Sequence, residues 1–138
     1  MLRSREIVNQ YYVIGPSGLP GNSDAGALDS WLIWQMVGLY PVVTQPVYLV
    51  LAPMFSDLLL RVGLEGKFLH ITALGLSDEN FYVQRLTVNG VSWNQSWLGH
   101  TDIADAGSIE FVLGKNPVIW DTGDLPPSPG NVTLRLED

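Results

Sequence analysis

The chain has 138 residues, of which 46% are hydrophobic and 15% charged, so it is long enough for one domain with a core and differs from a disordered segment. Seven Lys and Arg residues against fourteen Asp and Glu residues argue against nucleic acid or an anionic membrane as a partner. The absence of cysteine excludes disulfides and thiolate metal sites, and no stretch is long and apolar enough to span a bilayer.

The first forty residues combine helical patterns with a loop rich in glycine and proline. Apolar residues at helical spacing predict the end of an amphipathic helix over residues 4–12, and the charged residues before it do not have the pattern of a signal peptide. Three glycines and two prolines between Gly15 and Gly21 then predict a tightly specified, irregular loop. The cellular location stays open.

A second helix is predicted over residues 25–37, because this stretch contains no proline and Gly38 supplies a stop. Ser23 or Asp24 can cap its start, which places Asp24 at a helix N-terminus beside the loop. The helix is apolar almost all round, so it needs neighbours on most sides. Its polar residues are Asp29, Ser30 and Gln35, and we interpret Asp29 as part of a solvated face, with a second catalytic carboxylate as the alternative.

Beyond residue 40 the pattern changes to short strands separated by turn residues. Strands are predicted over 47–51, 55–62, 67–74, 80–88, 91–93 and 108–113. The Asn89-Gly90 dipeptide between two of them is a strong hairpin signal. Residues 116–130, rich in Pro, Gly and Asp, predict a surface loop, and residues 132–136 a possible last strand. The fold class is therefore α+β, with an antiparallel β unit after the helices.

This arrangement is lopsided, because nothing of comparable size in the sequence can surround the apolar helix. We therefore expect the chain to be the C-terminal piece of something larger, or the obligate partner of another chain. Trp31 and Trp34 are expected to be core residues, with a sugar-stacking platform as the alternative. Trp93 and Trp97, near the hairpin, are better candidates for stacking, although packing is the simpler expectation.

Three further patterns contain residue types that can form binding sites. The spacing Gly15-x-x-Gly18-x-x-Gly21 could cradle a phosphate, but it lacks the dinucleotide fingerprint and the P-loop ending, and Asp24 would repel a phosphate. His100 with Asp102 and Asp105 could suggest a metal site, although the spacing within a turn is unremarkable. His70 alternates with apolar residues on a strand and is expected to face solvent.

Several sequence runs, taken together, resemble the C-terminal signature of glycoside hydrolase family 92, exo-acting α-mannosidases, and are nearest to the fungal members. The runs that carry the resemblance are Gly18-Leu19-Pro20-Gly21-Asn22-Ser23-Asp24-Ala25-Gly26-Ala27, Ser30-Trp31, Gly38-Leu39-Tyr40-Pro41-Val42, Pro53-Met54-Phe55, Asn80-Phe81-Tyr82-Val83-Gln84, Leu86-Thr87-Val88-Asn89-Gly90, Ser96-Trp97-Leu98, His100-Thr101-Asp102-Ile103 and Gly107-Ser108-Ile109-Glu110-Phe111-Val112-Leu113-Gly114. Members are several times longer than this chain. The resemblance implies that residues 1–40 are the last loop and helices of a catalytic α/α toroid, and that residues 41–138 form a C-terminal, β-sandwich-like unit.

The resemblance also implies a chemistry, the calcium-dependent, inverting hydrolysis of terminal α-mannosides. By the loop motif, Asp24 resembles the general base, and Gly21, Asn22 and Ser23 resemble the substrate loop. A carboxylate at a helix N-terminus is favoured in the ionised form that a base requires. Many members carry a further acidic residue beside this aspartate, where Asn22 and Ser23 stand here. The general acid and most calcium ligands would lie upstream of Met1, so no metal ligand is assigned in this chain.

We therefore expect an α-mannosidase portion that is inactive alone. Its expected partners are mannose-terminated glycans and the missing N-terminal part of the enzyme or a partner chain, with no nucleic acid and no membrane. The alternative from another class is a non-catalytic β-sandwich remnant that binds glycans or packs on a partner.

Overall fold

Helices precede strands in the chain, and the computed structural model describes residues 1–63, 66–105 and 107–128. The elements are α1 (Leu2–Tyr11), a 3₁₀ turn η1 (Asp24–Gly26), α2 (Ala27–Val37), β1 (Leu39–Pro41), β2 (Val47–Val50), β3 (Asp57–Val62), β4 (Lys67–Leu74), β5 (Tyr82–Val88), β6 (Val91–Trp93), β7 (Trp97–Gly99), α3 (His100–Ile103) and β8 (Gly107–Gly114). The predicted α+β class is confirmed. None of the helices in these ranges has the length and apolar character needed to cross a membrane.

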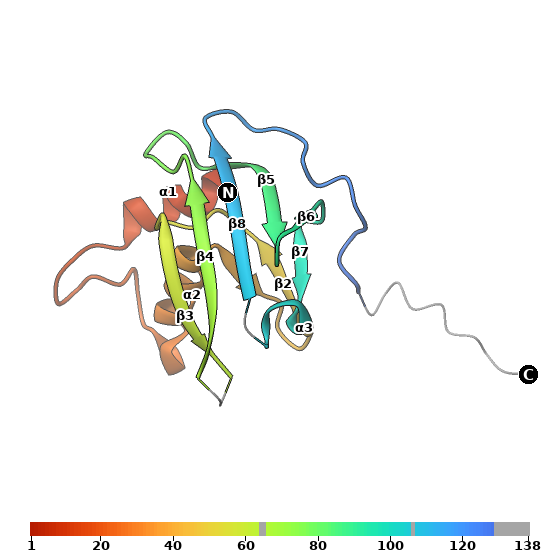
Figure 1. The fold of residues 1–138 in the computed structure, drawn as a ribbon. Helices are drawn as coiled ribbons and strands as arrows, with labels where there is room; N and C mark the ends of the chain where they lie inside the picture. The colour runs from red at the N-terminus through yellow and green to blue at the C-terminus, as the bar shows by residue number, and fades with distance from the viewer. Residues whose placement is uncertain (64–65, 106, 129–138) are drawn as a thin grey trace, which may run out of the picture.

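The strands form two sheets. The larger sheet has the order β3-β4-β8-β5-β6, and the smaller has the order β1-β2-β7. All pairs are antiparallel except β4 and β8, which run parallel, so the predicted antiparallel unit is wrong at this one pair of strands. In Figure 1 the larger sheet faces the viewer, and β2 and α2 lie behind it. The smaller sheet therefore covers one face of the larger sheet, an arrangement consistent with the sandwich-like unit that we expected.

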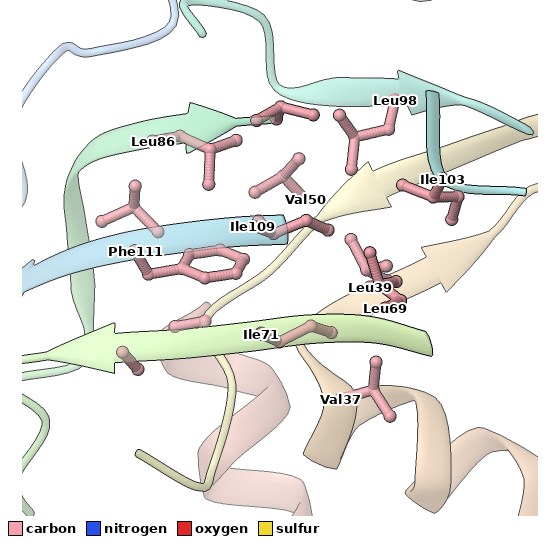
Figure 2. Packing of buried hydrophobic residues seen from close by; sticks show 14 of the residues in the cluster. Val37, Leu39, Val50, Leu69, Ile71, Leu86, Leu98, Ile103, Ile109 and Phe111 are labelled. Atoms are coloured by element: carbon pink, nitrogen blue, oxygen red, sulfur yellow. The ribbon is translucent and has the colours of Figure 1, made fainter. Parts of the chain in front are cut away.

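The core lies between the two sheets. Alternate residues of the central strands point into it, and Ile71, Leu86 and Phe111 are completely buried. Figure 2 shows these side chains facing Leu39, which comes from the smaller sheet, and Val37, the last residue of α2. Burying one such side chain stabilises the fold by about 1.5–3 kcal/mol relative to leaving it exposed. The core thereby attaches the end of α2 to the β unit.

The tight turn between β5 and β6 confirms the hairpin prediction. Asn89 and Gly90 both have positive φ, 51° and 78°, and the register pairs Val88 with Val91. This is the backbone of a two-residue type I′ turn, which favours Asn-Gly. The Asn89 side-chain oxygen also accepts the N–H of Ser108 at 2.9 Å. The hairpin is thus joined to the start of β8.

Other elements differ from their prediction in detail. The first helix is a complete ten-residue helix that starts at Leu2, two residues earlier than expected. The second begins at Ala27, two residues late, since Gly26 is left-handed. Strands β1 and β7 and helix α3, each of three or four residues, were not predicted. Residues 116–128 contain no helix or strand, as predicted, whereas 132–136 lie outside the described residues. The division of the chain at residue 40 stays a prediction.

Candidate functional site

The loop between α1 and α2 is closed by its own backbone. The Val13 N–H donates to the Gly18 carbonyl at 3.0 Å, and the Gly18 N–H donates to the Gly15 carbonyl at 3.1 Å. A side chain at Gly18 would collide with the Val13 carbonyl oxygen, so this approach requires glycine. The loop is therefore a defined structure that carries the chain back toward the start of α2.

Asp24 opens the 3₁₀ turn that precedes α2. The next two residues, Ala25 and Gly26, both have positive φ, 52° and 76°, so the backbone reverses between Asp24 and the helix. Gly26, and not Asp24, is the N-cap of α2, which corrects one of our two predicted caps. The Asp24 side chain is exposed, and within the described ranges its carboxylate has no hydrogen-bond or ion-pair partner. It is thus a free carboxylate beside a helix N-terminus.

Ser23 performs the capping that Gly26 cannot, because glycine has no side chain. Its hydroxyl accepts the N–H of Leu28 at 3.2 Å and lies 3.4 Å from the N–H of Asp29, both in the first turn of α2. The same hydroxyl donates to Oδ2 of Asp29 at 2.6 Å. The prediction of Ser23 as a cap is right in chemistry, although Ser23 lies three residues before the N-cap position.

Tyr12 fastens the other side of the loop to α2. Its ring stacks on Trp31, with 5.7 Å between ring centroids and 16° between planes, and its hydroxyl donates to the Leu28 carbonyl at 3.3 Å. Partial burial raises the pKa of the Tyr12 phenol, and the negative charge of Asp29 raises it further. Tyr12 therefore stays a neutral donor at physiological pH.

Apolar hollows flank this loop. One, of about 370 Å³, is lined by Ile7, Tyr11, Tyr12, Pro20, Leu28 and Trp31. Another, of about 450 Å³, is lined by residues that include Leu28, Trp31, Trp34, Tyr40 and Val43. Ile33 remains 59% exposed, so α2 is covered on only part of its surface. The expectation that the two tryptophans are core is met only in part, since both are half-buried.

The predicted histidine and carboxylate cluster does not converge on one point. The His100 ring meets the Tyr48 hydroxyl, with 3.0 Å between Nδ1 and Oη, whereas Asp102 accepts the Gly99 N–H at 2.7 Å and Asp105 pairs with Lys67 at 3.3 Å. In the residues that the structure describes, no group of three or more His, Asp or Glu side chains could hold a metal ion. These side chains have structural partners instead.

His70 and the two hairpin tryptophans also have defined contacts. His70 is exposed, as predicted, and its Nε2 lies 2.9 Å from Asp57 on the neighbouring strand. The indole N–H of Trp93 donates to the Trp97 carbonyl, and that of Trp97 donates to the Asp124 carbonyl, both at 2.9 Å. Trp93 also packs against the core. Both residues fit a packing role, the simpler of the two expectations.

Comparison with known proteins places the loop and its helix in a wider context. Residues 1–115 match the model of the glycosyl hydrolase family 92 catalytic domain. The chain belongs to this family. The loop with Asp24, both sheets and α3 all lie within the matched part, so the family match extends beyond the loop motif.

Two relatives show how much of a longer protein this chain corresponds to. An uncharacterized secreted glycosidase of Arthroderma benhamiae is 36% identical over 118 residues, which cover 83% of this chain and 15% of that protein. The structure of a family 92 α-mannosidase from Bacteroides thetaiotaomicron, in complex with mannoimidazole, superposes with a TM-score of 0.86 and 32% identity. That match covers 93% of this chain and 17% of the other. The chain thus spans about a sixth of these relatives' length.

A more distant structure agrees in fold alone. A family 92 inverting mannosidase from the same bacterium has a TM-score of 0.75 at 24% identity, over 84% of this chain. The arrangement of helices followed by two packed sheets is therefore common to family 92 proteins of low sequence similarity.

Proposed function

We propose that this chain supplies the base-bearing loop and the C-terminal β unit of a calcium-dependent, inverting α-mannosidase that acts on terminal α-mannosides of glycans. The observation that carries the proposal is the exposed Asp24 carboxylate, unpartnered in the described ranges, on a loop that the backbone and Ser23 hold in place. Family 92 membership and the similarity to an α-mannosidase in complex with mannoimidazole support it.

Inversion requires two carboxyl groups about 6.5–9.5 Å apart, one protonated to donate to the leaving oxygen and one ionised to activate a water on the opposite face. Asp24 suits the second role, because an ionised carboxylate without a partner has its lone pairs free to accept a proton from water. Gly21, Asn22 and Ser23 precede it and would form the substrate loop. A single carboxylate cannot serve both faces of the sugar, so the general acid must come from elsewhere in the enzyme.

The calcium requirement does not fit the residues that the structure describes, since they include no cluster able to hold a metal ion. In this proposal its ligands lie mostly outside the chain, as do the general acid and the rest of the catalytic domain.

The test is a full-length family 92 member in which this chain replaces the corresponding segment. Asp24→Asn removes the proton acceptor while keeping the side-chain volume, so kcat on an aryl α-mannoside should fall by ~10²–10⁴ with little change in substrate affinity. Because Asp24 caps no helix N–H, its loss should leave stability unchanged, which separates chemistry from folding. Asp121→Asn, at an exposed position of the tail, is the matched control.

Wild-type turnover by a folded Asp24→Asn chimera would remove Asp24 from the mechanism. That result would favour the other reading of the chain, as a non-catalytic unit that packs on a partner or binds glycans.

A further inference from the structure

We propose that Asp29 is a positioning residue for Asp24, acting through the hydroxyl of Ser23. This inference rests on the proposed function, because Asp24 must be catalytic for its position to matter. The Ser23–Asp29 hydrogen bond, at 2.6 Å, is the shortest side-chain hydrogen bond described in the structure. It joins the loop directly to the first turn of α2.

The geometry resembles a capping box in which the capping side chain comes from Ser23, on the far side of the backbone reversal, and not from the N-cap residue Gly26. In a regular capping box the N-cap side chain accepts a helix N–H, and an acidic residue at the third helical position reaches back to the N-cap. Here the N-cap is Gly26, so Ser23 receives the N–H of Leu28 from outside the helix. Asp29, at the third helical position, reaches back to the Ser23 hydroxyl and not to the backbone of Gly26.

We call the hydrogen-bonded pair Ser23 and Asp29 the clamp, and the backbone reversal at Ala25 explains why the loop needs it. Ala25 is held at φ 52°, a left-handed conformation that residues with a Cβ rarely adopt. This conformation persists only where neighbouring contacts enforce it. Ser23 and Asp29 are the side chains that bridge it, one on each side of the reversal. Releasing them allows Ala25 to relax and Asp24 to move.

Ser23 transmits its position to Asp24 through one peptide bond, since consecutive Cα atoms are about 3.8 Å apart. Asp24 itself has no partner in the described ranges, so the orientation of its carboxylate depends on the backbone around it. The charge of Asp29 strengthens the clamp, because a hydrogen bond to an ionised acceptor is stronger than a neutral one.

The experiment uses the same full-length chimera. Ser23→Ala and Asp29→Ala should each lower kcat by about 10- to 100-fold with little change in KM, because a misplaced base impairs the chemical step. Since the two side chains act as one unit, the double variant should be no slower than the slower single variant. Ser30→Ala is the matched control, because among the described residues this hydroxyl in the same turn bonds to the Ala27 carbonyl alone, so its loss should leave kcat unchanged.

Conservative variants keep the test decisive if an alanine variant fails to fold. Ser23→Thr retains the hydroxyl and Asp29→Asn retains an acceptor oxygen, so both should recover most of the lost kcat. Hydrogen exchange by mass spectrometry supplies a readout besides activity, in which peptides containing the amides of Leu28 and Asp29 should exchange faster in Ser23→Ala than in Ser30→Ala.

Failure of this inference is distinguishable from failure of the proposed function. If Asp24→Asn is inactive while Ser23→Ala and Asp29→Ala turn over like Ser30→Ala, the positioning role is wrong and the base assignment stands. Unchanged exchange at Leu28 and Asp29 in Ser23→Ala would likewise overturn the clamp. If Asp24→Asn is fully active, the proposed function fails, and with it any catalytic purpose of the clamp.

Discussion

Gly38 is the residue at which α2 meets the β unit, and replacing it with alanine tests this junction. Its φ is 85°, its N–H donates to the Trp34 carbonyl at 3.1 Å, and its carbonyl accepts the Leu51 N–H at 2.8 Å. A Cβ at this position would lie 2.6 Å from the backbone nitrogen of Pro53 and 2.8 Å from its Cδ. Both the backbone conformation and the close approach therefore require glycine.

The expected cost has two parts. A left-handed conformation costs a residue with a Cβ about 1–2 kcal/mol. Forcing one extra carbon against the Pro53 backbone, which cannot rotate away like a side chain, costs a further ~1–3 kcal/mol. Gly38→Ala should thus lower the free energy of unfolding by about 2–5 kcal/mol. Gly26 allows the conformational cost to be measured alone, because its φ is 76° but a Cβ there would meet nothing within 4 Å.

The assay is urea denaturation of the 138-residue chain, followed by tryptophan fluorescence at one protein concentration for all variants because association would shift the apparent stability, with Gly26→Ala as the matched control. Gly26→Ala should lose only the conformational part, about 1–2 kcal/mol. The difference between the two variants then measures the contact with Pro53. Equal losses in the two variants would show that the Pro53 contact is relieved at no cost, and the reasoning about the junction would be refuted.

Two further predictions concern the 138-residue chain on its own. It should hydrolyse no aryl α-mannoside even with added calcium, because one carboxylate cannot supply both acid and base; turnover that survives purification and is lost in Asp24→Asn would contradict this. Because α2 is only partly covered, its amides should exchange hydrogen faster than those of β5, and the chain should dimerise or aggregate through Leu28, Trp31 and Trp34. A demonstrated monomer in which α2 is better protected than β5 would overturn this prediction.

Much of the β unit could be predicted because its signals are local. In β4 and β8 the residues that alternate toward the core, among them Ile71 and Phe111, are apolar at a period of two. The Asn89-Gly90 turn requires positive φ at both positions, and few other dipeptides tolerate this. Gly38 marked the end of α2 for the same reason. Each of these features is decided by residues adjacent in the sequence.

The parallel pairing of β4 with β8 could not be predicted in this way. It joins Leu69 to Gly107 across 38 positions, and neither strand's alternation indicates which neighbour it takes or in which direction. The three-residue strands β1 and β7 are too short to show a period, and β1 contains Pro41, which argues against a strand. Such elements exist because neighbouring strands offer free backbone groups.

In the candidate site, the loop was predictable and its clamp was not. Glycine and proline content marked the irregular segment, and the motif singled out Asp24. The bond between Ser23 and Asp29 depends on Ala25 adopting a left-handed conformation, which its residue type disfavours. Spacing alone would have assigned Ser23 or Asp24 to a regular N-cap.

The central place of β8 in the larger sheet has a consequence for synthesis on the ribosome. The hairpins β3–β4 and β5–β6 are complete once their own residues are made, yet they do not pair with each other, because β8 lies between them. Until Gly114 has left the exit tunnel, one edge of β4 and one edge of β5 have no strand to pair with. Both edges can then pair with other chains. Emergence of β8 closes both edges in one step. We therefore expect the nascent chain to be most prone to wrong strand pairing between completion of β6 and emergence of β8.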